Sequence, residues 1–213
     1  MKTEELIRAL VSDCTIRPVA LRQAFALAVI PAVAITLCLY FVVLGPRPHL
    51  IALLATEPRL LFKISLAFLL VLLSALWVLR LARPGIDPRR AALALCIIPV
   101  LLATAIALEF HTVPASLWTQ KAIGTNAVHC LKSITFLGFA PLIAILLWLR
   151  YGAPRDPVVA GAAGGLLAGA IGAFLYATHC PDDSPFFVAL WYTLAITFLT
   201  ALGAVVGSRL LRW

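Results

Sequence analysis

Six long apolar runs divide the chain, and shorter polar segments separate them. Their approximate bounds are Gln23 to Leu44, Leu60 to Leu81, Ala91 to Leu108, Val128 to Leu149, Pro157 to Ala177 and Phe186 to Leu211. At a rise of about 1.5 Å per residue, each run is long enough to cross a hydrocarbon core of about 30 Å as an α-helix. A lipid-exposed backbone must satisfy its own polar groups, and a membrane barrel would show alternation instead of continuous runs. The pattern therefore predicts an all-α, polytopic membrane protein built as a six-transmembrane-helix bundle.

Composition agrees with this pattern. Hydrophobic residues make up 63% of the 213 residues and charged residues only 12%, whereas soluble domains are roughly half apolar. The first apolar run begins about twenty residues into the chain, is longer than the apolar region of a signal peptide, and lacks a small-residue cleavage pattern. We expect this run to stay attached as the first span.

The distribution of basic residues predicts the orientation. If the N-terminus is cytoplasmic, the inner segments hold twelve of the 17 basic residues. These are Lys2, Arg8, Arg17, Arg22, Arg80, Arg83, Arg89, Arg90, Arg150, Arg155, Arg209 and Arg212. Cytoplasmic loops are enriched in Lys and Arg, so we expect an N-in, C-in topology. The net charge of +8 is then a topology signal and an attraction to the anionic headgroups of the lipid bilayer, and no direct contact with nucleic acid is expected.

The dipeptide His-Cys occurs twice, as His129-Cys130 and as His179-Cys180. The fourth and fifth runs form a hairpin through the loop from Arg150 to Pro157. Counting back from this loop to Cys130, and forward from it to Cys180, gives about 30 Å and about 35 Å of helix. The hairpin therefore predicts that the two cysteines lie at nearly the same depth, at the outer membrane boundary.

Glycines and prolines inside the runs predict how the helices pack and bend. Gly161, Gly165 and Gly169 repeat every four residues in the fifth run, and Gly203 and Gly207 do so in the sixth. Such small-residue rows let two helix backbones approach closely, so we expect these glycines to pack helices together. Interior prolines at positions 31, 99 and 141 predict kinks in the first, third and fourth spans.

Two kinds of chemistry suit the paired cysteines. In the oxidising compartment outside an inner membrane, Cys130 and Cys180 can cycle between dithiol and disulfide. Alternatively, the two thiolates and the imidazoles of His129 and His179 form a soft ligand set of the kind that binds zinc or other thiophilic metals. No cofactor is obligatory in either interpretation, and the second implies a metal ion that binds transiently. The sequence leaves the resting state of the cysteines open between thiols, a disulfide and metal ligands.

Charged residues near the two cysteines would aid this chemistry. The carboxylates of Asp182 and Asp183 would attract a cation, and Lys132 would favour a thiolate, although a residue two positions from Cys130 does not face it on a helix. Cys14, Cys38 and Cys96 lack polar neighbours and are interpreted as small hydrophobic residues.

Several enzyme signatures are missing. The chain has no C-x-x-C, no H-E-x-x-H and no Walker A loop. We therefore expect a protein that is not an enzyme. The alternative from another class is a membrane thiol oxidoreductase or a small metal transporter that uses the same cysteines.

The polar N-terminal segment, residues 1–22, precedes the transmembrane domain, residues 23–213. Thr3 is a good N-cap and Glu4 lies in the first turn of a predicted helix, where the helix dipole favours an anion. The apolar side chains of this helix share one face at helical spacing, and they are Leu6, Ile7, Leu10 and Val11. A helix this short is marginal alone, so this face is expected to bind a groove in a partner. The alternatives are that it lies on the membrane surface or packs beneath the helix bundle.

Three stretches of the chain resemble the NrsF family of bacterial integral-membrane anti-sigma factors. They are the opening MKTEELIRALVSD, the segment VVAGAAGGLLAGAIGAFLYATHCPDDSPFFVALWYTLAI and the terminal GAVVGSRLLRW. The resemblance implies a six-span protein of the bacterial cell inner membrane, with both termini cytoplasmic, that negatively regulates an extracytoplasmic-function (ECF) sigma factor. It also implies that the N-terminal segment binds the sigma factor, and that Cys130 and Cys180 sense heavy metals or oxidants in a stress response.

Overall fold

The computed structural model describes residues 3–5, 21–83, 85–152 and 154–212. Within these ranges the chain is all-helical and forms no strand. The elements are α2 (Leu21–Val43), α3 (Leu50–Thr56), α4 (Pro58–Leu81), α5 (Arg89–Leu95), α6 (Ile97–Thr112), η1 (Ala115–Leu117), α7 (Trp118–Ile123), α8 (Ala127–Leu149), α9 (Pro157–Ala177), α10 (Pro185–Phe187), the π-helical turn η2 (Val188–Tyr192) and α11 (Thr193–Leu210).

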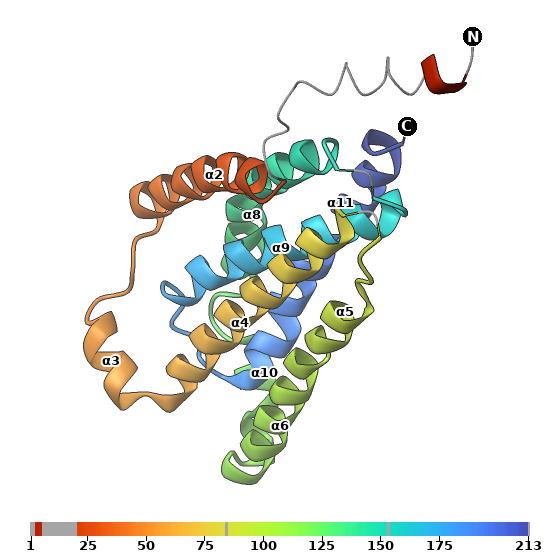
Figure 1. Ribbon diagram of the computed structural model, residues 1–213. Coiled ribbons are helices and arrows are strands. Elements are labelled where there is room, and N and C mark those ends of the chain that lie inside the picture. Colours follow the sequence, from red (N-terminus) through yellow and green to blue (C-terminus); the bar gives the residue numbers. More distant parts are fainter. Residues whose placement is uncertain (1–2, 6–20, 84, 153, 213) are drawn as a thin grey trace.

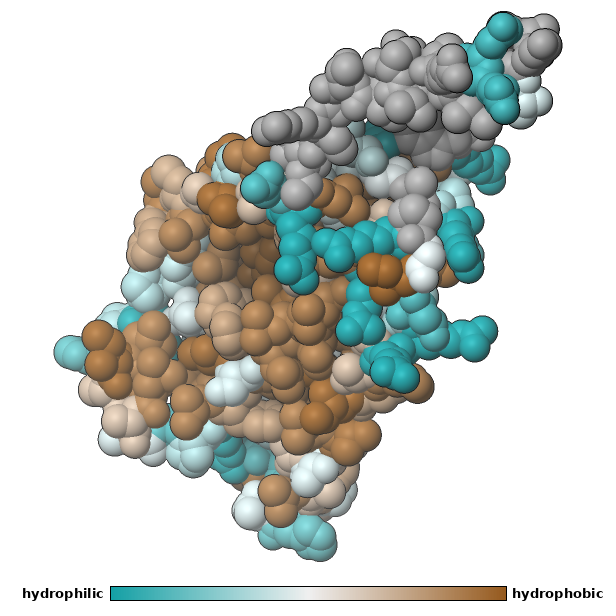
Figure 2. Space-filling model, viewed as in Figure 1, coloured by the Kyte–Doolittle hydropathy of each residue, from teal (hydrophilic) through white to brown (hydrophobic). Residues whose placement is uncertain are grey.

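Six helices of the described part are long and apolar enough to cross a membrane, which confirms the six predicted spans. They are α2, α4, the α5–α6 pair, α8, α9, and the continuous run α10–η2–α11. The fifth span has the predicted bounds, and the largest difference is in the third, which continues to Thr112. Figure 2 shows hydrophobic residues over the middle of one face and hydrophilic residues mainly toward its ends, as expected for a surface that faces lipid.

The fifth span, α9, is the centre of the bundle. Of its most apolar window 72% is buried, and it packs against α4, α8 and α11 (Figure 1). Glycines make this packing possible, because a Cβ added at Gly161 would collide with the carbonyl oxygen of Gly203, and one at Gly165 with that of Leu199. A Cβ at Gly169 would lie 3.1 Å from the Cα of Ile196. The backbones of α9 and α11 therefore meet along the two predicted glycine rows.

The third span is peripheral and broken. Only 6% of its apolar window is buried, and a single residue, Cys96, separates the end of α5 at Leu95 from the start of α6 at Ile97. Pro99 explains the break, because it has no N–H to donate to the carbonyl of Leu95 one turn earlier. The helices α2 and α8 continue through Pro31 and Pro141.

Short helices outside the six spans were not predicted. The segment between α2 and α4 contains α3, and the segment between α6 and α8 contains η1 and α7. Of the predicted partner-binding segment, Thr3 and Glu4 are exposed and helical. Leu6, Ile7, Leu10 and Val11 lie outside the described residues.

Candidate functional site

The loop from Thr178 to Ser184, which joins α9 to α10, carries the second His-Cys dipeptide. The last turn of α9 continues into it, since the backbone N–H groups of His179 and Cys180 both donate to the carbonyl of Tyr176 at 3.0 Å. Pro181 then stops the helix, because proline has no N–H to continue the ladder. The cysteine is thus held at the end of the central helix, and the acidic residues that follow it turn back over the bundle.

Lys63, a buried lysine on α4, binds this loop. Lys63 is only 1% exposed, and its Nζ donates to the carbonyl oxygens of Cys180 at 2.8 Å and Asp182 at 3.3 Å. The same ammonium pairs with the Asp183 carboxylate at 2.5 Å, and Arg47 donates to the other oxygen of that carboxylate at 2.9 Å. A buried charge is tolerated only when it is paired and fully hydrogen-bonded. Three acceptors from one loop therefore satisfy the Lys63 ammonium.

The other acidic residue of the loop, Asp182, caps α8. Its Oδ2 accepts hydrogen bonds from the backbone N–H groups of Thr125 at 3.1 Å and Asn126 at 3.0 Å. These N–H groups lie at the start of α8, where a carboxylate is favoured by the helix dipole. Gly124 permits the close approach, because its φ is +62° and a Cβ there would lie 2.9 Å from the same Asp182 oxygen.

Asp182 and Asp183 were predicted to attract a cation that the protein senses. The structure shows instead that the chain itself satisfies both carboxylates, Asp183 with two internal cations and Asp182 with a helix end. Lys63 was not predicted as a site residue, because its partners Cys180, Asp182 and Asp183 are distant in sequence and meet it only in the folded chain. One signal was available, since an ionisable residue inside an apolar run is a functional-site candidate by itself.

The two cysteines lie in one buried cluster. Both Cys130 and Cys180 are free thiols with no exposed surface, and Tyr176, Phe187 and Tyr192 belong to the same cluster. Cys130 stands in the first turn of α8, and the Sγ of Cys180 lies 3.9 Å from the carbonyl oxygen of Asp182. The fold therefore brings together the two thiols that the sequence analysis paired.

The Cys180 thiol is protonated at neutral pH. Burial raises the pKa of this thiol above its ordinary value, and the nearby Lys63 ammonium opposes the shift only in part. A thiol reacts and binds metals as the thiolate, so the resting site is weakly reactive. The cation that acts on the site is Lys63 rather than Lys132, which is exposed.

The predicted four-ligand metal set is not assembled. His129 is exposed although its neighbour Cys130 is buried, and His179 donates from Nδ1 to the carbonyl oxygen of Gly45 at 2.8 Å. Across residues 3–5, 21–83, 85–152 and 154–212, no three His, Cys, Asp or Glu side chains are grouped to hold a metal ion. A helix places successive side chains about 100° apart, and this separates His129 from the thiol next to it.

Further contacts tie the loop to the other segments at this end of the bundle. The Ser184 hydroxyl donates to Oε1 of Glu109 on α6 at 3.3 Å, and Glu109 is buried and pairs with Arg59 at 2.9 Å. Thr178 bonds to the Tyr40 hydroxyl at 2.6 Å, and its carbonyl accepts from the N–H of Arg47 at 3.1 Å. We call the Thr178–Ser184 loop with these partners the outer hub, because it links α2, α4, α6 and α8.

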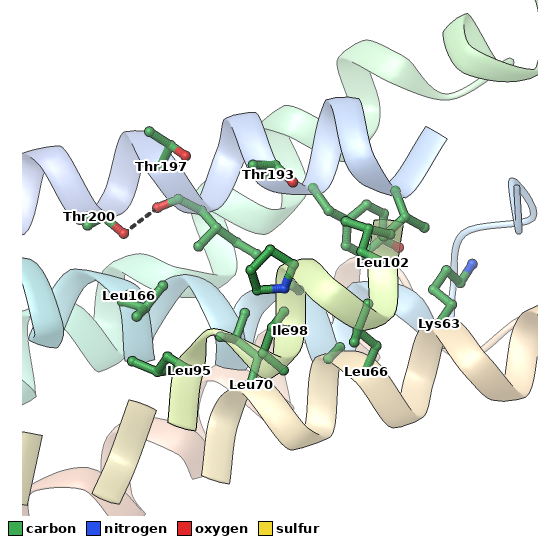
Figure 3. Close-up of a pocket in the computed structure, with 16 residues that line it drawn as sticks. Lys63, Leu66, Leu70, Leu95, Ile98, Leu102, Leu166, Thr193, Thr197 and Thr200 are labelled. Atoms are coloured by element: carbon green, nitrogen blue, oxygen red, sulfur yellow. Dashed lines mark hydrogen bonds between the residues drawn. The ribbon is translucent and has the colours of Figure 1, made fainter. Parts of the chain in front are cut away.

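An apolar pocket borders the outer hub within the membrane-spanning region. It has a volume of about 360 Å³ and lies between α4, the third span, α9 and α11. Figure 3 shows leucines such as Leu66 and Leu102 in its wall, threonines of α11 along one side, and Lys63 at one end with its amino group directed away. The pocket is walled mainly by hydrocarbon, so it separates the peripheral third span from the core without offering a polar ligand site.

Comparison with known proteins identifies relatives over the whole length of the chain. Residues 10–213 match the model of the NrsF family, described as "Negative regulator of sigma F". The probable anti-sigma-F factor NrsF of Azospira oryzae is 33% identical over 216 residues, and the anti-sigma-F factor NrsF of Caulobacter vibrioides is 36% identical over 217 residues; each alignment covers all of both chains. No solved structure matches the chain. These relatives are regulators rather than enzymes, and the match confirms the expected resemblance. The chain belongs to the NrsF family of negative regulators of sigma F.

Proposed function

We propose that the chain is an anti-sigma factor of the bacterial inner membrane that holds an extracytoplasmic-function sigma factor inactive and releases it when Cys130 and Cys180 are oxidised. Family membership supports the anti-sigma role. The observation that carries the sensing role is the burial of both free thiols in one cluster, beneath a loop on which several helices depend.

The proposed orientation places the outer hub in the periplasm. An even number of spans puts the start of α2 and the end of α11 on one side, and Figure 1 supports this. The excess of arginines at that side favours the cytoplasm. The N-terminal segment then reaches the compartment that contains RNA polymerase, and the membrane domain keeps the bound sigma factor away from it.

Oxidation provides a balanced chemical step for the sensor. A hydroperoxide (ROOH) accepts two electrons as its O–O bond breaks, and the two protons lost by the thiols convert its halves into an alcohol and water, while the S–S bond forms between the two sulfurs. The new bond constrains Cys180, whose carbonyl binds Lys63, and thus changes the packing of α8 and α9. To reverse a 99:1 population of bound sigma factor, the signal must supply about 5.5 kcal/mol. Disulfide formation is of this order, whereas one exposed charge is not.

Two observations favour oxidation over the metal stimulus. A stable zinc-type site needs four ligands, and neither histidine joins the two thiols. The described residues also offer no other group of three ligating side chains. A thiophilic cation bound by the thiols alone is kept as the second stimulus in the test below.

Changing both cysteines tests the sensor. The double variant Cys130→Ser, Cys180→Ser is expected to keep sigma-dependent transcription low and to abolish induction by hydroperoxide, because no disulfide can form. The measurement is a reporter for the sigma-dependent promoter, with and without hydroperoxide or a thiophilic metal. The matched control is Cys38→Ser, Cys96→Ser, since both of these thiols lie outside the buried cluster. Induction that survives in the sensor variant as it does in the control would remove the buried pair from the mechanism.

Shortening the N-terminus tests the partner-binding role. A chain without residues 1–13 is expected to remain in the membrane but to lose most of the sigma factor from the membrane fraction, because the predicted apolar face is gone. Co-sedimentation of the sigma factor with washed membranes measures this. The point variant Leu6→Ser, Leu10→Ser should behave like the deletion, and Lys2→Gln serves as its control. Full retention by the shortened chain would contradict the proposal.

A further inference from the structure

A polar pocket lies at the opposite end of the bundle from the outer hub, where α4 ends and α5 and α9 begin. Its volume is about 510 Å³. Four arginines line it, namely Arg80, Arg83, Arg89 and Arg155. Two aspartates and several apolar side chains complete the wall. Neither the proposed sigma binding nor the proposed sensing by the cysteine pair uses these residues.

The two carboxylates of the pocket already have partners. Asp156 is the N-cap of α9, and its Oδ1 accepts from the N–H groups of Val158 at 2.9 Å and Val159 at 3.1 Å. Asp87 accepts from the backbone N–H of Arg89 at 3.0 Å. In the part of the chain that the structure describes, no ion pair or hydrogen bond engages the guanidinium group of any of the four lining arginines. Four positive and two negative side chains leave a formal charge of +2 in the pocket.

The arginine side chains that line the pocket are well suited to bind a phosphate group. The planar guanidinium donates two parallel hydrogen bonds to a phosphate, and several arginines around one cavity provide such pairs from more than one side. A carboxylate side chain of a protein partner would use the same donors, but it would not explain the apolar part of the wall.

The position of the pocket identifies the source of the phosphate. Arg80 lies in the last turn of the second span and Arg89 in the first turn of the third, so the pocket stands at the boundary between hydrocarbon and headgroups. Leu81, Ile86 and Val159 line it beside the arginines, and Ile86 is 41% exposed. A ligand that is anionic at one end and apolar at the other satisfies both kinds of lining, and basic pockets between membrane helices bind such headgroups.

We infer that this pocket binds the phosphate headgroup of an anionic phospholipid and thereby joins the turn between the second and third spans to the start of the central helix α9. The inference is independent of sigma binding and of the cysteine pair. The bound lipid supplies the counter-charge that the arginines lack within the described chain. It also holds the peripheral third span at the end where its first helix, α5, contacts α4.

Lipid titration of the full-length protein in a neutral detergent tests the inference. Phosphatidylglycerol, phosphatidylcholine and inorganic phosphate are added separately, and native mass spectrometry and thermal unfolding report binding. The pocket variant carries Arg80→Gln, Arg83→Gln, Arg89→Gln and Arg155→Gln. The matched control carries Arg90→Gln, Arg150→Gln, Arg209→Gln and Arg212→Gln, which removes four exposed arginines that do not line the pocket. A milder variant, Arg80→Gln with Arg89→Gln, replaces the first if that one does not elute as a single folded species.

The expected result is that phosphatidylglycerol binds the native chain and the control, and binds the pocket variant about tenfold more weakly. Phosphatidylcholine should bind all three chains weakly and equally. Equal loss in the pocket variant and the control, or equal binding of the two lipids by the native chain, overturns the inference. If inorganic phosphate displaces phosphatidylglycerol and stabilises the native chain as strongly, the pocket remains a phosphate site but its source is a soluble anion rather than a lipid.

Discussion

Replacing Lys63 with Met is expected to lower the free energy of unfolding by about 3 kcal/mol or more. The side chain is buried and of similar length, so the substitution removes the charge without opening a large cavity. It leaves the carbonyl oxygens of Cys180 and Asp182 without their donor and leaves Asp183 with Arg47 alone. Each buried polar group that loses its partner costs about 1 to 3 kcal/mol. Unfolding of the purified protein in detergent, followed by circular dichroism, measures the change.

The matched control is Lys132→Met, an exposed lysine near the same end of the bundle, for which we expect a change within about 0.5 kcal/mol. A double-mutant cycle with Asp183→Asn separates the ion pair from simple loss of packing, because residues in direct contact give non-additive energies. If Lys63→Met costs no more than Lys132→Met, the lysine does not hold the loop, and the outer hub is not a mechanical unit.

Adding two methyl groups to the glycine row of α9 should have an effect of similar size. The variant Gly161→Ala, Gly165→Ala places each Cβ against a carbonyl oxygen of α11, at Gly203 and Leu199. Backbone atoms cannot rotate away, so the two helices must separate along their contact. Overpacking of this kind costs about 1 to 3 kcal/mol per site, which exceeds the gain in helix propensity of about 1 kcal/mol per residue.

The neighbouring variant Gly164→Ala is the control for this prediction. Its Cβ would lie 3.1 Å from a side-chain methyl of Ile145 on α8, and a side chain can adjust where a backbone cannot. We therefore expect Gly164→Ala to be neutral or slightly stabilising in the same unfolding measurement. Equal effects of the two variants would contradict a close backbone contact between α9 and α11.

The transmembrane helices were predictable because hydrocarbon thickness and backbone hydrogen bonding leave few alternatives for a long apolar run. Helix length predicted a similar depth for Cys130 and Cys180 once the hairpin was recognised, and the structure places both in one buried cluster. The ligands of the proposed metal set were not predictable in the same way. His179 turns to the Gly45 carbonyl, far away in sequence, and only the tertiary structure reveals that competing partner.

The outer hub was beyond the sequence for a similar reason. Lys63 and Asp183 are 120 residues apart, and nothing local marks them as partners. The same holds for Asp182, whose role as a cap for α8 depends on a contact between two loops. The helices α3 and α7 were missed because seven and six residues are too few to show a periodic pattern.

The glycine-lined surface of α9 also bears on how easily α9 can shift lengthwise against α11. Helices that interlock through large side chains resist lengthwise sliding, because each knob must leave its hole. Toward α11, Gly161 and Gly165 present no side chain, so a short piston-like stroke of α9 requires little rotamer change along that seam. One end of this rod carries Cys180, and the other begins at Asp156, beside the arginine-lined pocket. Under the proposed function, a displacement started at the thiols would meet little side-chain resistance along the α9–α11 seam on its way to the opposite membrane surface.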